Sequence, residues 1–273
     1  MKRNIPLLSC SWLALLTGAL APTALTIARA DRLQPTDELQ AVLWIQRSAE
    51  YRAICRQTFA MATEQLDQAI ADASQTAAVE QFDLKFQHLP PAIIVDVDET
   101  MLDNAPYNAR LIQDGKVFTP ESWAAWVKEQ KAEPVPGALE FARRATALGI
   151  TVFYVTNRDK SLEAATYANL EHCGFPVSMD QLLMRGEIDE DGSEKRNRRA
   201  HIAKSHRILM LCGDDLGDFV AGTRSASATA RNRTRDLYDS LFGERWFVLP
   251  NPIYGSWTKT LGEDKRSALI THR

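Results

Sequence analysis

Two carboxylates lie one residue apart at the end of a short apolar run. The chain reads Ile-Ile-Val at 93–95, and Asp96 and Asp98 follow within the stretch Asp-Val-Asp-Glu-Thr. Two acids this close repel each other and are costly to bury, so they persist in water, at the start of a helix or around a cation. The cation is the setting that makes chemistry possible.

Polar residues follow two further apolar runs in the same way. The run at 150–155 ends at Thr156 and Asn157, and the run at 207–212 is followed by Gly213 and three acids, Asp214, Asp215 and Asp218. Alone, such an acidic end could be an ordinary turn or helix cap. Three coincident strand ends favour one shared site, because ligands of parallel α/β sheets bind beyond the carboxyl ends of the strands.

The elements that must position these residues alternate between strand and helix. Apolar periodicity predicts helices over 36–74, 136–148, 161–172 and 194–205, and buried strands over 92–95, 150–155, 181–184 and 207–212. This alternation predicts an α/β fold with a doubly wound parallel sheet covered on both faces. Residues 221–235, rich in Ser, Thr, Ala and Arg, are expected to form a mobile surface loop.

The residue types at the predicted site favour a hard cation and a phosphate ester. Three or four carboxylates with carbonyls and water make an all-oxygen site suited to Mg²⁺. A phosphate monoester can complete its coordination shell, Thr156 can donate a hydrogen bond to a phosphoryl oxygen, and Lys195 can supply a positive charge. The five histidines are scattered and no CxxC pattern occurs, so zinc and histidine-nucleophile chemistry have little support.

Length and charge limit the classes of partner. The 273 residues suffice for one large domain or a domain with an insertion, and the formal charge is −3. Because no global basic field is present, a nucleic acid polymer is not expected as partner. A small molecule fits better, and a homodimer stays open.

The first thirty residues differ in kind from the rest. Lys2 and Arg3 precede an apolar run, and small residues at 28–30 have the spacing of a signal-peptidase site, so residues 1–30 are predicted to be a secretory signal. An uncleaved membrane anchor is the alternative, with lipidation at Cys10 as another. Cleavage would leave a mature protein of formal charge −6 in the periplasm or outside the cell. Membrane association is expected only if the N-terminus is retained or lipidated.

Export would place the chain in an oxidising compartment, yet few cysteines remain. Cys55, Cys173 and Cys212 are odd in number and irregularly spaced, which predicts no disulfide framework. One pair could form, and the sequence does not say which.

Four motifs resemble those of the haloacid dehalogenase-like (HAD) phosphohydrolases. They are DVDET at 96–100, VTNR at 155–158, Lys195 and GDDLGDF at 213–219. Further segments resemble the bacterial class C acid phosphatases, at 43–51 (LWIQRSAEY), 98–104 (DETMLDN), 134–138 (PVPGA) and 250–257 (PNPIYGSW). The resemblance runs from about residue 38 to 262.

The resemblance implies a role for individual residues. Asp96 matches the nucleophile that forms an aspartyl-phosphate, and Asp98 matches the acid that protonates the leaving oxygen and then activates water. Asp96, the main-chain carbonyl of Asp98 and Asp214 match the Mg²⁺ ligands, and Asp218 matches a second acid close to the metal.

Other positions carry a functional and a structural interpretation side by side. Lys195 fits the third motif as Lys-x-x-Arg, whereas its neighbours Arg196, Arg198 and Arg199 are expected on the solvated face of a helix. Trp123 and Trp126, at helical spacing, are expected in the core.

Two positions are predicted to bind substrate. The resemblance implies that Tyr254 stacks on the base of a nucleotide, with packing of the last strand as the alternative, and Asn157 is included as a polar residue at the end of the predicted strand over 150–155. The fourth motif departs from the family pattern, with Asp215 where Asn is common and Gly217 where an acid is frequent, so metal affinity could differ.

These observations predict a domain order and a function. Residues 31–90 form N-terminal helices contributing to a helical cap, 91–262 the HAD-like core with a cap insertion around 103–135, and 263–273 a tail. The resemblance implies a secreted or periplasmic Mg²⁺-dependent acid phosphatase acting on small phosphomonoesters, 5′-nucleotides among them. The alternatives are a phosphotransferase using the same site and a non-catalytic surface binding protein.

Overall fold

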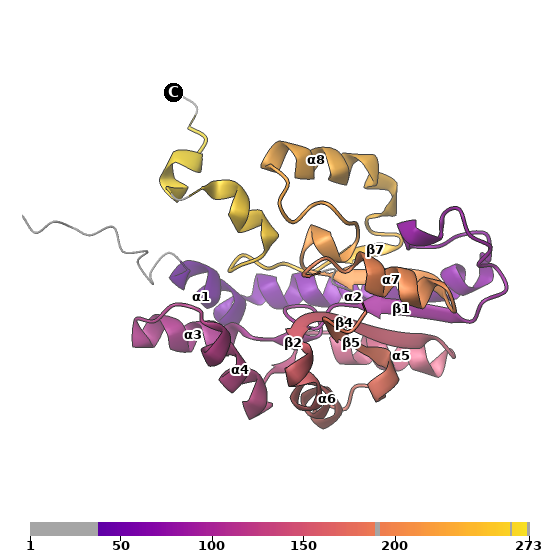
Figure 1. The fold of residues 1–273 in the computed structure, drawn as a ribbon, viewed down its shortest axis with the longest axis horizontal. Helices are drawn as coiled ribbons and strands as arrows, with labels where there is room; N and C mark the ends of the chain where they lie inside the picture. The colour runs from indigo at the N-terminus through magenta and orange to yellow at the C-terminus, as the bar shows by residue number, and fades with distance from the viewer. Residues whose placement is uncertain (1–37, 189–191, 263, 272–273) are drawn as a thin grey trace, which may run out of the picture. The chain divides into compact units, whose positions relative to one another are not determined.

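The centre of the fold is a sheet of five parallel strands. Its order is β5-β4-β1-β6-β7 (Figure 1), built from β1 (Pro91–Val95), β4 (Thr151–Asp159), β5 (Leu182–Arg185), β6 (Arg207–Gly213) and β7 (Trp246–Val248). The predicted α/β fold with a parallel sheet is confirmed. Strand β4 extends through Asp159, beyond the predicted end at residue 155, so Thr156 and Asn157 lie within the strand.

The computed structural model describes residues 38–188, 192–262 and 264–271. The predicted signal segment at 1–30, with Cys10, lies outside the described residues. Among the helices in these described ranges, none is both long enough and apolar enough to cross a membrane. Cys55, Cys173 and Cys212 are all free thiols.

The helices are α1 (Leu39–Arg47), α2 (Ala49–Ala71), α3 (Ala105–Asp114), α4 (Pro120–Glu129), α5 (Ala138–Ala147), α6 (Glu163–His172), α7 (Arg196–Ala203) and α8 (Ala228–Leu237). The helices predicted over 36–74, 136–148, 161–172 and 194–205 are present as α1 with α2, α5, α6 and α7, and the structure adds α3, α4 and α8. Short 3₁₀ helices are η1 (Val79–Gln81), η2 (Lys160–Leu162), η3 (Met179–Gln181), η4 (Leu216–Asp218), η5 (Asp239–Leu241), η6 (Ser256–Leu261) and η7 (Lys265–Ala268). A two-stranded antiparallel ribbon joins β2 (Leu102–Asp103) to β3 (Glu133–Pro134) and brackets α3 and α4.

Each face of the sheet carries its own apolar core. Ile93 and Val95 of β1 pack in the larger core with residues of α1 to α6, whereas Ala92 and Ile94 pack in the second core with residues of α7 and the segment around β7. Figure 1 shows α5 and α6 across the strands from α7 and α8. Because alternate residues point to opposite faces, a strand buried on both faces must be apolar at every position.

Helix α8 corrects the prediction of a mobile loop over residues 221–235. Ser227 begins the helix, its side chain accepting a hydrogen bond from the amide of Ala230 at 3.3 Å. No residue of α8 is buried, so the segment lacks the apolar periodicity from which a helix is predicted. Capping and helix-forming residues, rather than a buried face, mark it as a helix.

The order of the strands reverses direction at β1. The chain passes from β1 to β4 and β5 on one side, and then to β6 and β7 on the other. Val95 is level with both Tyr154 of β4 and Cys212 of β6. The carboxyl ends of these strands therefore lie side by side at one edge of the sheet, which is where parallel α/β sheets bind ligands.

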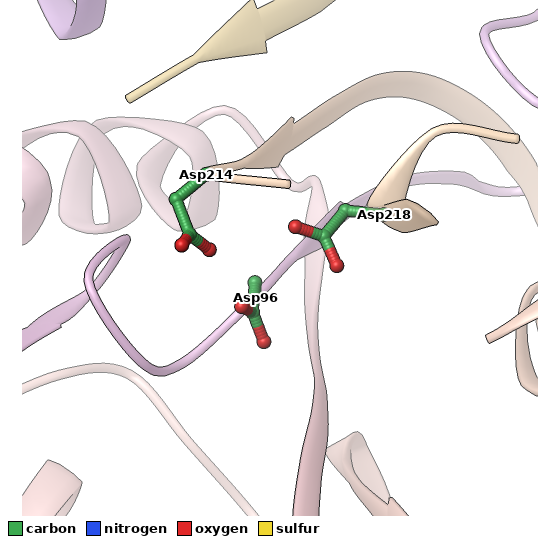
Figure 2. A group of neighbouring side chains, drawn as sticks. All are labelled: Asp96, Asp214 and Asp218. Atoms are coloured by element: carbon green, nitrogen blue, oxygen red, sulfur yellow. The ribbon is translucent and has the colours of Figure 1, made fainter. Parts of the chain in front are cut away.

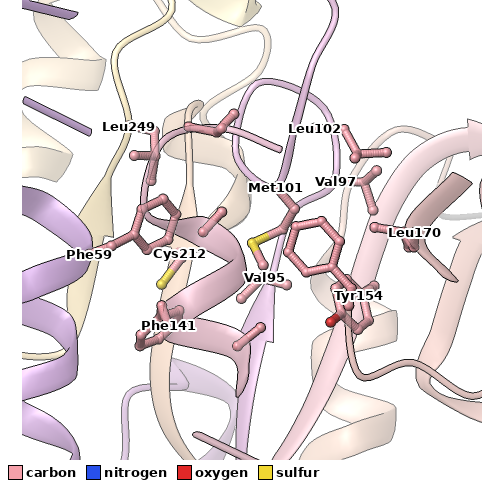
Figure 3. Packing of buried hydrophobic residues seen from close by; sticks show 14 of the residues in the cluster. Phe59, Val95, Val97, Met101, Leu102, Phe141, Tyr154, Leu170, Cys212 and Leu249 are labelled. Carbon is pink, nitrogen blue, oxygen red and sulfur yellow. The ribbon is translucent and has the colours of Figure 1, made fainter. Parts of the chain in front are cut away.

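Packing of α2 against α5 depends on two phenyl rings. Phe59 and Phe141 are each 1% exposed, with ring centroids 5.5 Å apart (Figure 3). Phe59→Ala should lower the free energy of unfolding by about 3–5 kcal/mol because it leaves a cavity in the larger core. Urea unfolding measures the change.

Met61 supplies the matched control on the same helix. Its side chain is 45% exposed, so Met61→Ala should change stability by no more than about 0.5 kcal/mol. Equal losses in the two variants would contradict the packing of α2 on α5.

Candidate active site

Three carboxylates from two strand ends meet in one cluster. Asp96, Asp214 and Asp218 each place an oxygen within 4.8 Å of the others, and Figure 2 shows their side chains converging. Asp96 and Asp218 are 8% and 6% exposed. Residues separated by more than 110 positions in the sequence are thus brought together, as predicted for the strand ends at Asp96 and Asp214.

The backbone of β1 and β6 fixes this approach. The amide of Asp96 donates to the carbonyl of Cys212 at 2.9 Å, which extends the pairing of the two strands by one residue. At Gly213, an added Cβ would lie 2.5 Å from the Cβ of Asp218. Glycine is therefore required there, because any side chain would push Asp218 away from the other carboxylates.

Lys195 is the cation of the cluster. Its Nζ lies 2.5 Å from Oδ1 of Asp96 and 2.7 Å from Oδ1 of Asp218, and the residue is 2% exposed. It stands immediately before α7, so the start of that helix sets its position. A basic group next to two carboxylates can bind a phosphoryl oxygen while limiting the repulsion between the acids.

The sequence predicted Arg196, Arg198 and Arg199 on a solvated face of α7. The structure confirms this for Arg196 and contradicts it for Arg198 and Arg199. Arg198 and Arg199 are 2% and 0% exposed. Arg198 donates to the carbonyl of Thr156 and to Oδ1 of Asn157, the latter at 2.8 Å.

Arg199 connects α7 to a different part of the site. It donates to Oε1 of Glu80 at 2.7 Å and to the carbonyls of Gly217 and Asp218 at 3.1 and 3.0 Å. The partners of both arginines are distant in sequence and many are backbone oxygens, so residue types alone did not reveal their burial.

Burial and mutual repulsion raise the pKa values of two acids of the cluster, Asp96 and Asp214. Burial raises the pKa of Asp96 to about 6, an effect that Lys195 opposes and Asp218 reinforces. Burial also raises the pKa of Asp214 well above its ordinary value, with added repulsion from Asp218 and Asp96. For Lys195, burial alone would lower the pKa, yet Asp218 and Asp96 hold it above the usual range.

The donor set fits a hard divalent cation. Three carboxylates face one ammonium group, so the ionised cluster carries an excess of two negative charges. All donors are oxygen atoms, the ligands that Mg²⁺ and Ca²⁺ take in proteins. A cation between Asp96, Asp214 and Asp218 would offset the repulsion that helps to raise the pKa values of Asp96 and Asp214.

Asp98 points to a different set of partners. Its carboxylate forms an ion pair with Arg158, 2.8 Å from Nη2, and accepts from Nδ2 of Asn104 at 2.9 Å. The hydroxyl of Thr156, a buried residue, lies 3.4 Å from Oδ2 of Asp98. Thr156 and Asp98 are thus brought together, whereas Asn157 has its amide oxygen bonded to Arg198.

Arg158 and Asn104 are site residues that sequence reasoning missed. Both lie within the segments that carry the resemblance, since Arg158 ends VTNR and Asn104 follows the two aspartates by a few residues. A buried arginine needs a carboxylate or several hydrogen-bond acceptors as partners. Its position at the end of a strand, near acids that needed a partner, could therefore have identified Arg158 from the sequence.

Asp215 has a structural role that explains its presence beside Asp214. Its carboxylate accepts from the amide and hydroxyl of Ser256, each at 2.7 Å, and from the amide of Gly217 at 2.9 Å. Burial would raise its pKa, but these donors hold it below the ordinary value. Asp215 therefore fixes the segment that follows β7.

Tyr254 belongs to this segment and reaches the cluster through Asn251. Oδ1 of Asn251 accepts from the amides of Ile253 and Tyr254 at 3.0 and 3.3 Å, and its Nδ2 donates to Oδ2 of Asp214 at 2.7 Å. The side chain of Tyr254 packs partly buried against the larger core. One asparagine thus joins a predicted metal ligand to the turn that carries Tyr254.

Comparison with known proteins places the chain in one family. The family model described as "HAD superfamily, subfamily IIIB (Acid phosphatase)" matches residues 13–257. The class C acid phosphatase from Bacillus anthracis with tungstate bound is 29% identical, with a TM-score of 0.76 over 88% of this chain and 98% of that chain. Another structure of the class C acid phosphatase from that organism is 31% identical, with a TM-score of 0.73 over 84% and 89% of the two chains.

A curated relative matches over a shorter range. Acid phosphatase 1 of Solanum lycopersicum is 29% identical over 167 residues, which cover 59% of this chain and 57% of that protein. The chain spans about three fifths of the length of the first curated relatives that it matches.

The carboxylate cluster should bind a divalent cation that stabilises the fold. In the wild type, a cation at a hundred times its Kd should raise the free energy of unfolding by about 2.7 kcal/mol. Asp214→Asn should abolish this effect without lowering the stability of the cation-free protein, because the amide removes one repelling charge. Thermal unfolding with and without Mg²⁺, Mn²⁺ and Ca²⁺ measures both quantities.

Asp83→Asn, at an exposed aspartate, is the control and should keep the full response to the cation. A full response in Asp214→Asn would show that the cation binds elsewhere.

Proposed function

The chain belongs to the acid phosphatases of HAD superfamily subfamily IIIB, and from that premise we propose that it is a Mg²⁺-dependent hydrolase of small phosphomonoesters. The observation that carries the proposal is Lys195 between Asp96 and Asp218, with Asp214 completing the cluster at the carboxyl ends of β1 and β6. A cation-binding acid cluster with a buried lysine is what transfer of a phosphoryl group requires.

Mg²⁺ would be held by Asp96, Asp214, Asp218 and the main-chain carbonyl of Asp98. When bound, it would neutralise charge on the phosphoryl oxygens. Lys195 supplies a second positive charge, and the hydroxyl of Thr156 can turn from its long 3.4 Å contact with Asp98 to a phosphoryl oxygen. Tungstate, bound by the Bacillus anthracis relative, is a tetrahedral oxyanion like phosphate and supports such an anion site.

In the first half-reaction, a carboxylate oxygen of Asp96 attacks phosphorus. The bond from phosphorus to the ester oxygen breaks, its electron pair stays on that oxygen, and a proton from Asp98 converts the oxygen into the alcohol product. The enzyme then carries an aspartyl-phosphate on Asp96.

In the second half-reaction, Asp98 takes a proton from water as the water oxygen attacks phosphorus. The bond between phosphorus and Asp96 breaks and leaves its electron pair on the carboxylate, so inorganic phosphate is released and both aspartates return to their starting states. An alcohol in place of water would give phosphotransfer by the same residues, and product analysis with added alcohol separates the two reactions.

The substrate class is proposed from the resemblance and from the turn after β7. Asn251 holds that turn to Asp214, so Tyr254 has a defined position relative to the cluster and can stack on a nucleotide base. Asn157, bonded to Arg198, contributes a polar side chain at the end of β4. We therefore expect 5′-nucleotides among the substrates.

The location and domain order rest on the sequence. Cleavage after residue 30 would release the protein to the periplasm or the exterior, where an acidic pH optimum fits the family. Residues 31–90 and the insertion around 103–135 are proposed to form a cap on the core at 91–262.

The purified protein should release phosphate from p-nitrophenyl phosphate and 5′-nucleotides in the presence of Mg²⁺, and EDTA should stop the release. Asp96→Asn should lower turnover by about 10⁴-fold or more, because the amide cannot attack phosphorus, while leaving the fold intact. Phosphate release and circular dichroism provide the two measurements.

Asp67→Asn is the matched control, since the Asp67 side chain is 70% exposed on α2. Activity retained in Asp96→Asn would remove Asp96 as the nucleophile, and no release by the wild type from any phosphomonoester would end the proposal.

A further inference from the structure

Helix α4 presents two tryptophans that both reach partners of Asp98. Trp123 and Trp126 lie one turn apart and were predicted in the core; Trp126 is buried in the larger core, and Trp123 packs partly buried against it. Yet Nε1 of Trp126 donates to Oδ1 of Asn104 at 2.8 Å, and the ring of Trp123 lies under the guanidinium of Arg158, 5.6 Å from its carbon to the ring centroid. Asn104 and Arg158 are the residues that contact the carboxylate of Asp98 at short range.

The two oxygens of Asp98 are held very differently. Oδ1 accepts from Nδ2 of Asn104 at 2.9 Å and from Nη2 and Nε of Arg158 at 2.8 and 3.0 Å. Among the described residues, the hydrogen bonds to Oδ2 are longer, 3.3 Å from Nε of Arg158 and 3.4 Å from the hydroxyl of Thr156. Since hydrogen bonds weaken with distance, Oδ1 is saturated and Oδ2 is the oxygen that can exchange a proton.

Trp126 decides which way the amide of Asn104 points. An indole N–H can only donate, so the atom of Asn104 that it meets must be the carbonyl oxygen. The opposite orientation would place two donors against each other. Nδ2 of Asn104 is thereby directed at Oδ1 of Asp98, and because Asn104 is 0% exposed, water cannot take the place of this partner.

Arg158 is fixed by comparable means. It is 2% exposed, donates from Nη1 to the hydroxyl of Thr166 at 3.2 Å, and stacks over Trp123. A planar guanidinium held at three points presents Nε and Nη2 to the carboxylate in one orientation, which an ammonium group could not do.

We propose that Arg158, Asn104 and the two tryptophans of α4 are positioning residues that hold Oδ1 of Asp98 and reserve Oδ2 for proton transfer to the leaving oxygen. This rests on the proposed function, in which Asp98 is the acid. The proton leaves Oδ2 for the ester oxygen as the bond from phosphorus to that oxygen breaks. Misplacing Oδ2 therefore impairs poor leaving groups, which need the proton, more than good ones, which depart as anions.

The test is the dependence of activity on the leaving group. For p-nitrophenyl phosphate, the leaving phenolate is stable without a proton, whereas for glycerol phosphate the leaving alkoxide is not. Trp126→Phe keeps a ring and removes the N–H donor, and it should raise the ratio of kcat/KM for p-nitrophenyl phosphate to that for glycerol phosphate about tenfold. Arg158→Lys keeps the charge but loses the two-point contact with the carboxylate, so it should raise this ratio about 100-fold. This variant provides a second test if Trp126→Phe fails to fold.

Trp246→Phe is the matched control. The indole of Trp246, 0% exposed, donates from Nε1 to the carbonyl of Ala77 at the same 2.8 Å, in the core on the other face of the sheet. It should leave the ratio unchanged whatever it does to stability.

Each outcome has one meaning. Equal losses on both substrates in Trp126→Phe and Arg158→Lys would overturn the positioning role while leaving the phosphatase proposal standing. A wild type that hydrolyses neither substrate would instead end the proposed function itself.

Discussion

Repulsion among buried carboxylates is the constraint on which the rest of the site depends. Oxygens of Asp96, Asp214 and Asp218 lie within 4.8 Å of one another, and burial raises the pKa values of Asp96 and Asp214. Lys195 supplies one positive charge, a cation would supply the remainder, and the absence of a side chain at Gly213 lets Asp218 approach the other acids. The cluster is therefore destabilising for the fold alone and favourable once a cation and an anionic phosphoryl group are present.

Helix α7 and the lysine that precedes it distribute positive charge over the site. Lys195 meets the acids, Arg198 holds the end of β4, and Arg199 holds the backbone at Asp218 while paired with Glu80. Buried charges are tolerated only when paired and hydrogen-bonded, so each of these side chains ties one segment of the site to the same helix. A single displaced helix would thus disturb β4, η4 and the carboxylates together.

The site divides between rigid strands and an inserted segment. Asp96 and Asp214 follow paired strands, whereas Asp98 lies in a tight turn where Glu99 adopts a φ of 56°, an uncommon conformation for a residue with a side chain. The buried carboxylate of Glu99 accepts from the amide of Asn104 at 2.9 Å and so closes that turn. The side chain of Asp98 thereby takes its orientation from Arg158 and from Asn104, which Trp126 of α4 contacts.

The sequence by itself determined the α/β alternation, the strand ends and the acids that meet there, because strand period and apolar runs are local and parallel strands end at one edge. It did not show α8, which buries no residue, nor the burial of Arg198 and Arg199, whose partners include backbone carbonyls. Only the tertiary structure decided that Trp126 orients Asn104 and that Arg158 faces Asp98 across 60 residues. Such contacts depend on the direction of single side chains and on backbone oxygens common to every residue, which residue types and spacing do not specify.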